Sequence, residues 1–188
     1  AFDVKFADRE GKLQHVWATS WGVSSRLMGA LIMTHSDDHG LVLPPKLAPF
    51  QVVIVPIYKN EDELNEISSV VETLKSELIK NNVSVKFDTR DTIRPGQKFA
   101  QHEIQGVPIR IAIGPKDLQN KTVEIARRDN LTKDYVKLDL ATDHVIYLLE
   151  EIQSNLLDRA LKFRDENITR VDTFDEFKEV LENKGGFI

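Results

Sequence analysis

Two polar side chains before an apolar run could bind an anion. The run begins at Leu27, and Ser24 and Arg26 precede it, just after Gly22. Arg26 would fall in the first turn of a helix, where a positive charge opposes the helix dipole. A bound phosphate would remove that cost, because helix amides and a guanidinium both attract anions. On the residues alone, a surface arginine beside an ordinary capped helix is the simpler interpretation.

A second set of useful side chains lies further along the chain and comprises Phe99, Glu103, Arg110, Lys116 and Asp117. Phe99 and Glu103 are four residues apart on an expected short helix, so they share one face. Arg110 points away from the isoleucine face of its expected strand, and Lys116 and Asp117 follow in the next turn. On the residues alone, a solvated rim with one core aromatic is the simpler interpretation of this set.

A third cluster, formed by His35, Asp37, Asp38 and His39, contains residue types that ligate metals. These residues come at the end of an expected helix, before Gly40, where polar residues are common. Closeness in sequence is weak evidence for ligand geometry. The sequence therefore predicts no metal site.

The first part of the chain reads as a hairpin, a helix and a connector. Residues 2–6 and 12–18 alternate apolar and polar side chains around a turn, as in two paired strands. Residues 27–34 are apolar nearly all round, which predicts a buried helix capped by Ser24 or Ser25. Three prolines make residues 40–49 a stiff connector, where we expect a domain boundary.

From residue 51 onward, strands and helices alternate. The expected strands are 51–57, 83–87, 109–113, 122–126 and 134–138, with a turn at 114–117. The expected helices are 62–80, 99–105, 143–166 and a short last one opened by Thr173 and Glu176. The third helix should turn Val145, Leu149, Ile152, Leu156 and Phe163 inward and leave Glu150, Glu151, Asp158 and Arg159 in solvent. This alternation predicts an α/β fold with a parallel or mixed sheet.

Composition narrows the function classes. The chain has 188 residues, no cysteine and a net charge of −5, so disulfides and cysteine-bound zinc are excluded and nucleic acid could bind only on a local patch. Such a patch would need Arg90, Arg94, Lys98, Arg110 and Lys116 on one side. No apolar stretch could span a bilayer, and the protein is expected to be cytoplasmic. Both ends fall inside elements, which suggests a piece of a longer protein.

The run from Thr19 to Gly29 resembles motif 3 of class II aminoacyl-tRNA synthetases, and the run as far as Pro45 resembles prolyl-tRNA synthetases of the archaeal and eukaryotic type. The resemblance continues through residues 98–99, 103–110 and 114–117. It implies the end of an antiparallel-sheet catalytic domain (1–48), a mixed-sheet α/β anticodon-binding domain (49–166) and the start of a C-terminal extension (167–188).

The resemblance also implies residue roles. Ser24 and Arg26 would bind ATP, with Arg26 acting in catalysis, and Trp21 and Gly22 would line the proline pocket. Anticodon binding would fall to Phe99, Glu103, Arg110, Lys116 and Asp117, which would read two guanines.

The implied longer enzyme is a cytoplasmic homodimer that activates proline with ATP and Mg²⁺ and charges tRNA(Pro). The chain alone should hold no cofactor and be inactive, because motifs 1 and 2 belong upstream. The alternatives are a threonine or histidine enzyme of the same subclass and a non-catalytic synthetase-like module that binds nucleic acid. A receiver-like signalling domain is disfavoured because no acidic residue ends the strand at 51–57.

Overall fold

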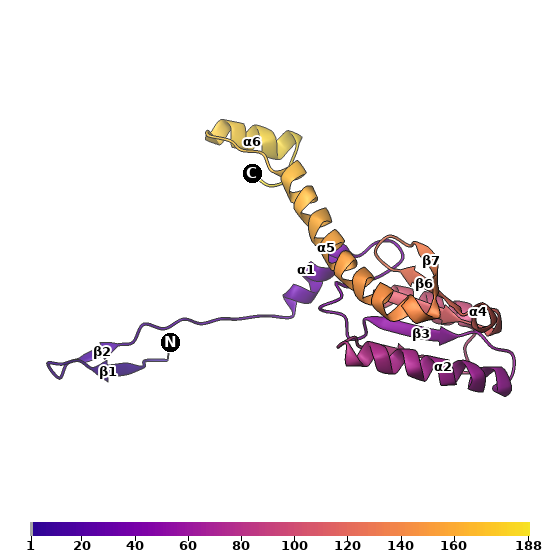
Figure 1. Ribbon diagram of the computed structural model, residues 1–188. Helices are drawn as coiled ribbons and strands as arrows, with labels where there is room; N and C mark the ends of the chain where they lie inside the picture. Colours follow the sequence, from indigo (N-terminus) through magenta and orange to yellow (C-terminus); the bar gives the residue numbers. More distant parts are fainter. Residues whose placement is uncertain (1) are drawn as a thin grey trace. The chain divides into compact units, whose positions relative to one another are not determined.

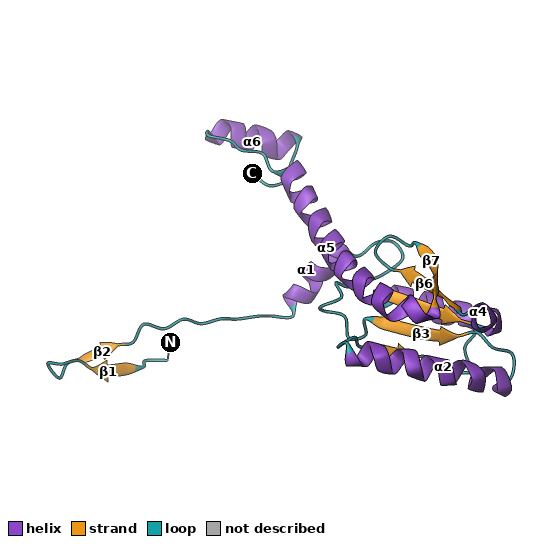
Figure 2. Ribbon diagram, viewed as in Figure 1, coloured by secondary structure: helices purple, strands orange, loops and turns teal. Residues whose placement is uncertain are grey.

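The computed structural model describes residues 2–188, whose strands form two separate sheets (Figures 1 and 2). The elements in chain order are β1 (Lys5–Ala7), β2 (Leu13–His15), α1 (Arg26–His35), β3 (Val52–Pro56), α2 (Glu61–Lys80), β4 (Val85–Phe87), α3 (Pro95–Ile104), β5 (Ile109–Ile113), α4 (Pro115–Asn120), β6 (Thr122–Arg127), β7 (Lys133–Lys137), the 3₁₀ helix η1 (Leu138–Leu140), α5 (Ala141–Asn167) and α6 (Phe174–Asn183). They belong to two compact units, one ending at Ala30 and one running from Leu31 to Ile188.

The first unit contains the predicted hairpin. Strands β1 and β2 pair antiparallel, with Phe6 opposite Gln14. The turn between them is fixed by Asp8, whose Oδ1 accepts hydrogen bonds from the amides of Glu10 and Lys12 at 3.0 and 2.8 Å. A carboxylate that bonds the backbone two residues on is a common turn device.

The second unit is built on a five-stranded mixed sheet in the order β4-β3-β5-β6-β7. Strand β3 pairs parallel with β4 and β5, whereas β6 pairs antiparallel with β5 and β7. This α/β fold with a mixed sheet confirms the prediction from the sequence. Parallel strands need crossover connections, and helices α2 and α3 supply them.

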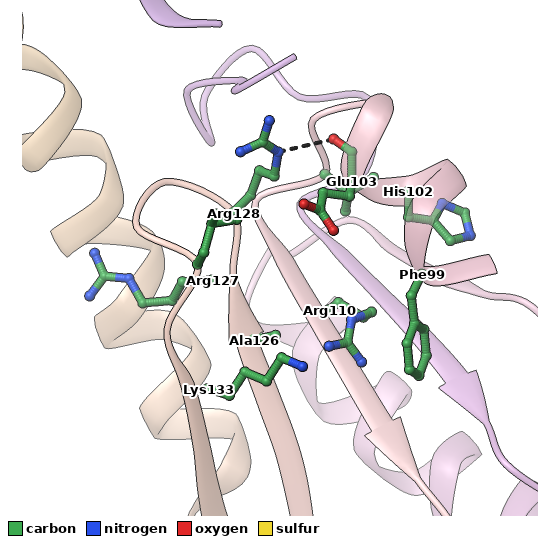
Figure 3. Close-up of a pocket in the computed structure, with 10 residues that line it drawn as sticks. Phe99, His102, Glu103, Arg110, Ala126, Arg127, Arg128 and Lys133 are labelled. Carbon is green, nitrogen blue, oxygen red and sulfur yellow. Dashed lines mark hydrogen bonds between the residues drawn. The ribbon is translucent and has the colours of Figure 1, made fainter. Parts of the chain in front are cut away.

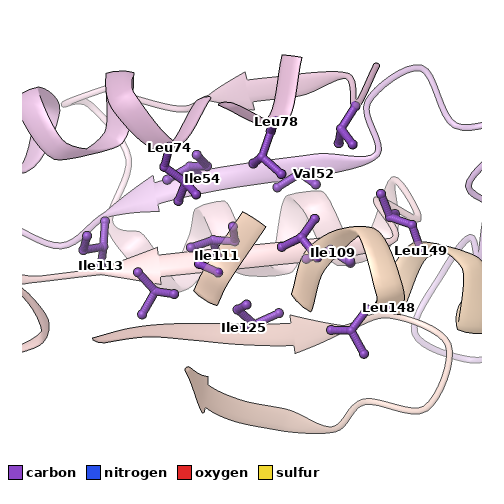
Figure 4. Packing of buried hydrophobic residues seen from close by; sticks show 14 of the residues in the cluster. Val52, Ile54, Leu74, Leu78, Ile109, Ile111, Ile113, Ile125, Leu148 and Leu149 are labelled. Atoms are coloured by element: carbon purple, nitrogen blue, oxygen red, sulfur yellow. The ribbon is translucent and has the colours of Figure 1, made fainter. Parts of the chain in front are cut away.

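One face of this sheet carries the main hydrophobic core. Ile54, Ile109, Ile111 and Ile125 point from the strands toward α2 and α5 and are at most 1% exposed. Figure 4 shows these strand side chains meeting leucines of the two helices. Helix α2 begins at its cap Asn60, whose Oδ1 accepts from the amide of Glu63 at 2.9 Å. Both predicted long helices are thus confirmed.

The opposite face of the sheet is only partly covered. Val53 and Val55 of β3 form a small second core with Val107, against which Phe99 of α3 packs. Side chains alternate along a strand, so residues such as Arg110 on β5 also belong to this face. A ligand site on this face would therefore be bordered by α3 and by the strands that α3 leaves uncovered.

The proline-rich segment, residues 40–49, is part of the second unit and packs into it. Val42 is 3% exposed and joins the main core, and the amides of Leu41 and Leu43 donate to the carbonyls of Ile104 and Gly106 at 3.0 and 3.3 Å. Gly106 follows α3 and has a φ of 73°, the left-handed conformation that commonly ends a helix.

Several expectations were wrong. Helix α1 has no buried residue, since most of its side chains are exposed and only Leu31 and His35 are half-buried. Phe163 is 61% exposed, since α5 at that point has passed the sheet, and its ring meets the edge of Phe187. The turn at 114–117 continues into α4, because Pro115 sets a helical φ and Asp117 Oδ2 accepts from the Gly114 amide at 2.8 Å.

The long helix α5 is also less solvated than expected. Glu151 pairs with Arg127 at 2.9 Å, and Arg159 Nη1 donates to the carbonyl of Asp129 at 3.3 Å. None of the helices within residues 2–188 is both long and apolar enough to cross a membrane.

Candidate functional site

A pocket of about 200 Å³ lies on the partly covered face of the sheet, beside α3 (Figure 3). Phe99, His102 and Glu103 of α3 line one side of it, and Arg110 of β5 and Lys133 of β7 line another. Of the residues predicted from the sequence, Phe99 and Glu103 come from α3 and Arg110 comes from β5. The fold brings these three together.

Arg110 is held in a fixed orientation. Its guanidinium carbon lies 3.7 Å from the centroid of the Phe99 ring, and its Nη2 donates to Glu124 Oε1 at 3.0 Å. Its Nη1 is buried and has no hydrogen-bond partner within residues 2–188. Buried donors normally have partners, so this nitrogen is available to an acceptor that enters the pocket.

Glu103 offers a partly exposed carboxylate at the end of α3. Its side chain is 39% exposed, and Oε1 lies 3.8 Å from His39 Nδ1. The backbone carbonyl of Glu103 accepts from Arg128 Nε at 3.0 Å, as the dashed line in Figure 3 marks. Arg128 also donates hydrogen bonds to both carboxylate oxygens of Asp37, and these bonds lower the pKa of that carboxyl to about 2. These contacts fix the end of α3, where the Glu103 carboxylate remains partly exposed beside His39.

A buried polar network sets the position of α3. Asp88 follows β4 and is 2% exposed. Arg90 donates to both of its carboxylate oxygens at 2.8 and 2.6 Å, and His102 Nε2 lies 2.8 Å from Oδ2. The hydrogen bonds from Arg90, and then that of His102, hold the pKa of Asp88 well below its usual range. Lys98 Nζ donates to the Asp88 carbonyl at 3.0 Å.

Lys98 was expected to belong to a cationic surface patch, and that expectation is wrong. It is 1% exposed, and burial lowers its pKa. Arg90, though partly exposed, is engaged by Asp88. Of the expected cationic patch, Arg110 lines the pocket and Lys116 stands exposed on α4.

Lys116 and Asp117 lie away from the pocket. They follow β5 on α4, whereas Arg110 is near the start of that strand, and neither residue lines the pocket. Asp117 caps α4 through the Gly114 amide. The sequence-predicted set is thus divided between the two ends of β5.

The first predicted set lies in the other unit. Arg26 begins α1, as expected, and the amide of Leu27 donates to the Ser24 carbonyl at 3.1 Å. Trp21 is 93% exposed, and Gly22 has open space where a Cβ would stand. These residues form the exposed start of a helix.

The His35–His39 cluster is used for structure. Asp37 is taken by Arg128 and by the amide of His39. Over residues 2–188, no group of three or more His, Cys, Asp or Glu side chains is placed to hold a metal ion.

Several important residues were missed by the sequence analysis. Asp88, His102, Arg127 and Arg128 are buried polar residues whose partners are distant in sequence, so no local pattern identifies them. Arg127 points toward α5 and Arg128 toward α3, as Figure 3 shows. Tyr135 could have been found, because the period of two in its predicted strand puts it on the face opposite Val136.

Comparison with known proteins gives the family context. A family model described as "Anticodon binding domain" matches residues 51–152. Proline–tRNA ligases from Christiangramia forsetii and Flavobacterium johnsoniae are each 63% identical over 188 residues, and one from Bacteroides fragilis is 57% identical. In each case the match covers all of this chain and 38% of the relative, so the chain spans well under half of their length.

A solved structure is similar over nearly the whole chain. The crystal structure of prolyl-tRNA synthetase from Cryptosporidium parvum, complexed with L-proline and AMP, matches with a TM-score of 0.82 and 38% identity. The match covers 96% of this chain and 39% of that one.

Proposed function

Because the chain belongs to the anticodon binding domain family, we propose that it recognises the anticodon of a proline tRNA as part of a proline–tRNA ligase. The observation that carries the proposal is the convergence of Glu103, Arg110 and Lys133 on one pocket at the uncovered part of the sheet. A carboxylate with two cations suits a nucleotide, which offers base donors and phosphate oxygens.

Guanine fits the polar groups of this pocket. Its Watson–Crick edge presents two adjacent N–H donors, which one carboxylate can accept together, and its other acceptors suit a cation. Glu103 supplies the carboxylate, and Arg110 supplies the unpartnered Nη1. Lys116 and Asp117, beyond the far end of β5, are assigned to the neighbouring guanine. The chain thus reads two bases from two places on one surface.

Because the similar proteins are named as proline–tRNA ligases, they support proline, rather than threonine or histidine, as the amino acid that the longer enzyme activates. In the longer ligase, proline carboxylate would attack the α-phosphate of ATP and displace pyrophosphate, and the adenylate would then pass its prolyl group to tRNA(Pro) and release AMP. Arg26 and Ser24 would hold the ATP phosphates in front of α1, where the guanidinium and the helix amides favour negative charge. Trp21 and Gly22 would line the proline pocket.

The exposed side chains of the hairpin region and of α1 support a longer protein. Trp17, Trp21 and Met33 are each more than 85% exposed, whereas such residues are usually covered. We assign their cover to the part of the ligase outside this chain, and we assign Mg²⁺ to the ATP that the longer ligase binds. The proposal also includes that the longer ligase is a homodimer in the cytoplasm. The chain alone should not form prolyl-adenylate.

The decisive experiment is a titration of the chain with an RNA stem-loop that carries the proline anticodon. Changing either guanine to adenine should weaken binding roughly tenfold or more, because a carboxylate loses its donors at about 1–3 kcal/mol. Glu103→Gln should reduce this discrimination, whereas Glu150→Gln on the solvent side of α5 should leave it unchanged. Equal affinity for all the stem-loops would remove the base-reading role.

A further inference from the structure

Strand β7 presents a row of exposed side chains beside the pocket. Lys133, Tyr135 and Lys137 alternate with Val136, which packs against the main core, so all three lie on the opposite face. In register with them across β6 stand Ala126, Glu124 and Thr122. The small core under α3 involves β3 and does not include β7. This part of the sheet is open to a ligand.

The aromatic ring free for stacking on this face is that of Tyr135. Phe99 is partly buried, and its ring already carries the Arg110 guanidinium at 3.7 Å. Tyr135 is 70% exposed and makes no ring contact with an aromatic or cationic side chain in the described part of the chain. An unpaired base would therefore find an open ring on β7 rather than on α3.

The orientation of Tyr135 is linked to the pocket. Its hydroxyl donates to Glu124 Oε2 at 3.2 Å, and Glu124 Oε1 accepts from Arg110 at 3.0 Å. The negative charge of Glu124 raises the pKa of Tyr135, and so does their hydrogen bond, so the hydroxyl remains a donor. Asp117 also acts electrostatically on Tyr135. The ring thus lies between the two groups assigned to the guanines.

The charges around Tyr135 favour a polyanion. Lys133 and Lys137 flank it at two residues on either side, and neither forms an ion pair within residues 2–188. Figure 3 shows the Lys133 side chain extending over Ala126 toward Arg110. Exposed cations around an aromatic ring on a sheet are the combination that binds single-stranded nucleic acid.

We propose that Tyr135 stacks on an unpaired base of the bound RNA loop while Lys133 and Lys137 hold the phosphates on either side. The proposal rests on the proposed anticodon recognition and extends it to a subsite on β7 that reads no base edge. Phe99 becomes a positioning residue, which holds Arg110 in place. A continuous RNA track then runs from Glu103, across β7, to Asp117.

The test uses the chain and the fluorescein-labelled proline anticodon stem-loop, together with stem-loops in which each loop nucleotide in turn is abasic. Loss of one base–aromatic stack is worth about fivefold or more in affinity. We expect Tyr135→Leu to lose that factor, whereas Tyr135→Phe, which keeps the ring, stays within about twofold of the original protein. Tyr147→Leu is the matched control, because Tyr147 is 62% exposed on α5.

One abasic position should identify the stacked base. At that position the original protein loses the stacking factor, and Tyr135→Leu loses nothing further. Lys133→Gln and Lys137→Gln should each lower the slope of log affinity against log salt by about 0.7. Unchanged binding by Tyr135→Leu, or an equal loss for every abasic stem-loop, would overturn the stacking role. If the original protein binds but ignores the guanines, only the base reading fails; no RNA binding at all would overturn both proposals.

Discussion

The guanidinium carbon of Arg110 lies 3.7 Å from the centroid of the Phe99 ring, so the aromatic residue of the pocket supports a cation. Arg110 is fixed a second time by Glu124, at 3.0 Å. Its remaining nitrogen, Nη1, has no partner among the described residues. The two contacts set the plane of the guanidinium and aim one donor at whatever enters the pocket.

Phe99→Leu should therefore weaken stem-loop binding through Arg110. A cation–π contact is worth about 0.5–2 kcal/mol, which corresponds to roughly a three- to tenfold loss at the middle of that range. Titrations of Phe99→Leu, Arg110→Gln and the double variant measure the coupling. We expect the double variant to bind no worse than Arg110→Gln alone. Losses that multiply would mean that Phe99 contacts the RNA by itself.

Asp88→Asn should destabilise the protein and should do so in a pH-dependent way. Breaking a buried charge pair costs about 3–5 kcal/mol, and Asp88 pairs with Arg90 and also contacts His102 Nε2. Because the pKa of folded Asp88 lies below the usual 3.8, the carboxylate contributes stability above that value. The contribution is lost progressively as the pH falls below it.

Urea unfolding of the original protein and of Asp88→Asn between pH 7 and pH 3 measures this effect. The difference in unfolding free energy should be largest at neutral pH and should narrow in acid. Asp158→Asn, an exposed residue of α5, is the control and should show a small, constant difference. A difference between the Asp88 variant and the original protein that grows in acid would contradict the assignment.

The sequence predicted the fold well because its local patterns and its tertiary contacts agree. Ile109, Ile111 and Val123 occupy alternate positions of their strands, and this spacing puts their apolar side chains on the face that forms the core. The buried polar residues were not predictable in the same way. Lys98 looks like a surface cation on an amphipathic helix, and only the loop after β4 brings the Asp88 carbonyl to it. The spacing of residues along the chain does not show which distant group will pair with a buried charge.

The candidate site was predicted in part for a similar reason. Phe99 and Glu103 share a helix face, and strand alternation puts Arg110 on the side that α3 covers. Their meeting therefore follows from two local rules. Lys116 and Asp117 are separated from them because β5 extends for five residues, or roughly 16 Å at about 3.3 Å per residue. Lys116 and Asp117 are close to Arg110 in the sequence, but this closeness does not predict that they lie close to it in space.

Gly40→Ala should destabilise the segment that joins α1 to the sheet. Gly40 has a φ of 132°, and an added Cβ would lie 2.6 Å from the Cα of Ile104, next to Glu103. Backbone strain alone costs about 1–3 kcal/mol. Thermal unfolding should show a clearly lower melting temperature. Gly96→Ala in α3 is the matched control, because its Cβ meets nothing within 4 Å; that variant should be neutral or more stable. Equal effects of the two changes would contradict this account.

Arg26→Ala tests the role assigned to the start of α1, and it must be made in the full-length ligase because the chain alone is expected to be inactive. Removing a charge-assisted contact to phosphate costs about 1.5–3 kcal/mol, or roughly ten- to a hundredfold in rate. Proline-dependent ATP–pyrophosphate exchange should slow by that factor, while the melting temperature hardly changes, since Arg26 is exposed. Arg9→Ala, in the exposed turn of the hairpin, is the matched control and should keep the original rate. An unchanged exchange rate for Arg26→Ala would return this residue to the simpler interpretation, a surface arginine beside a capped helix.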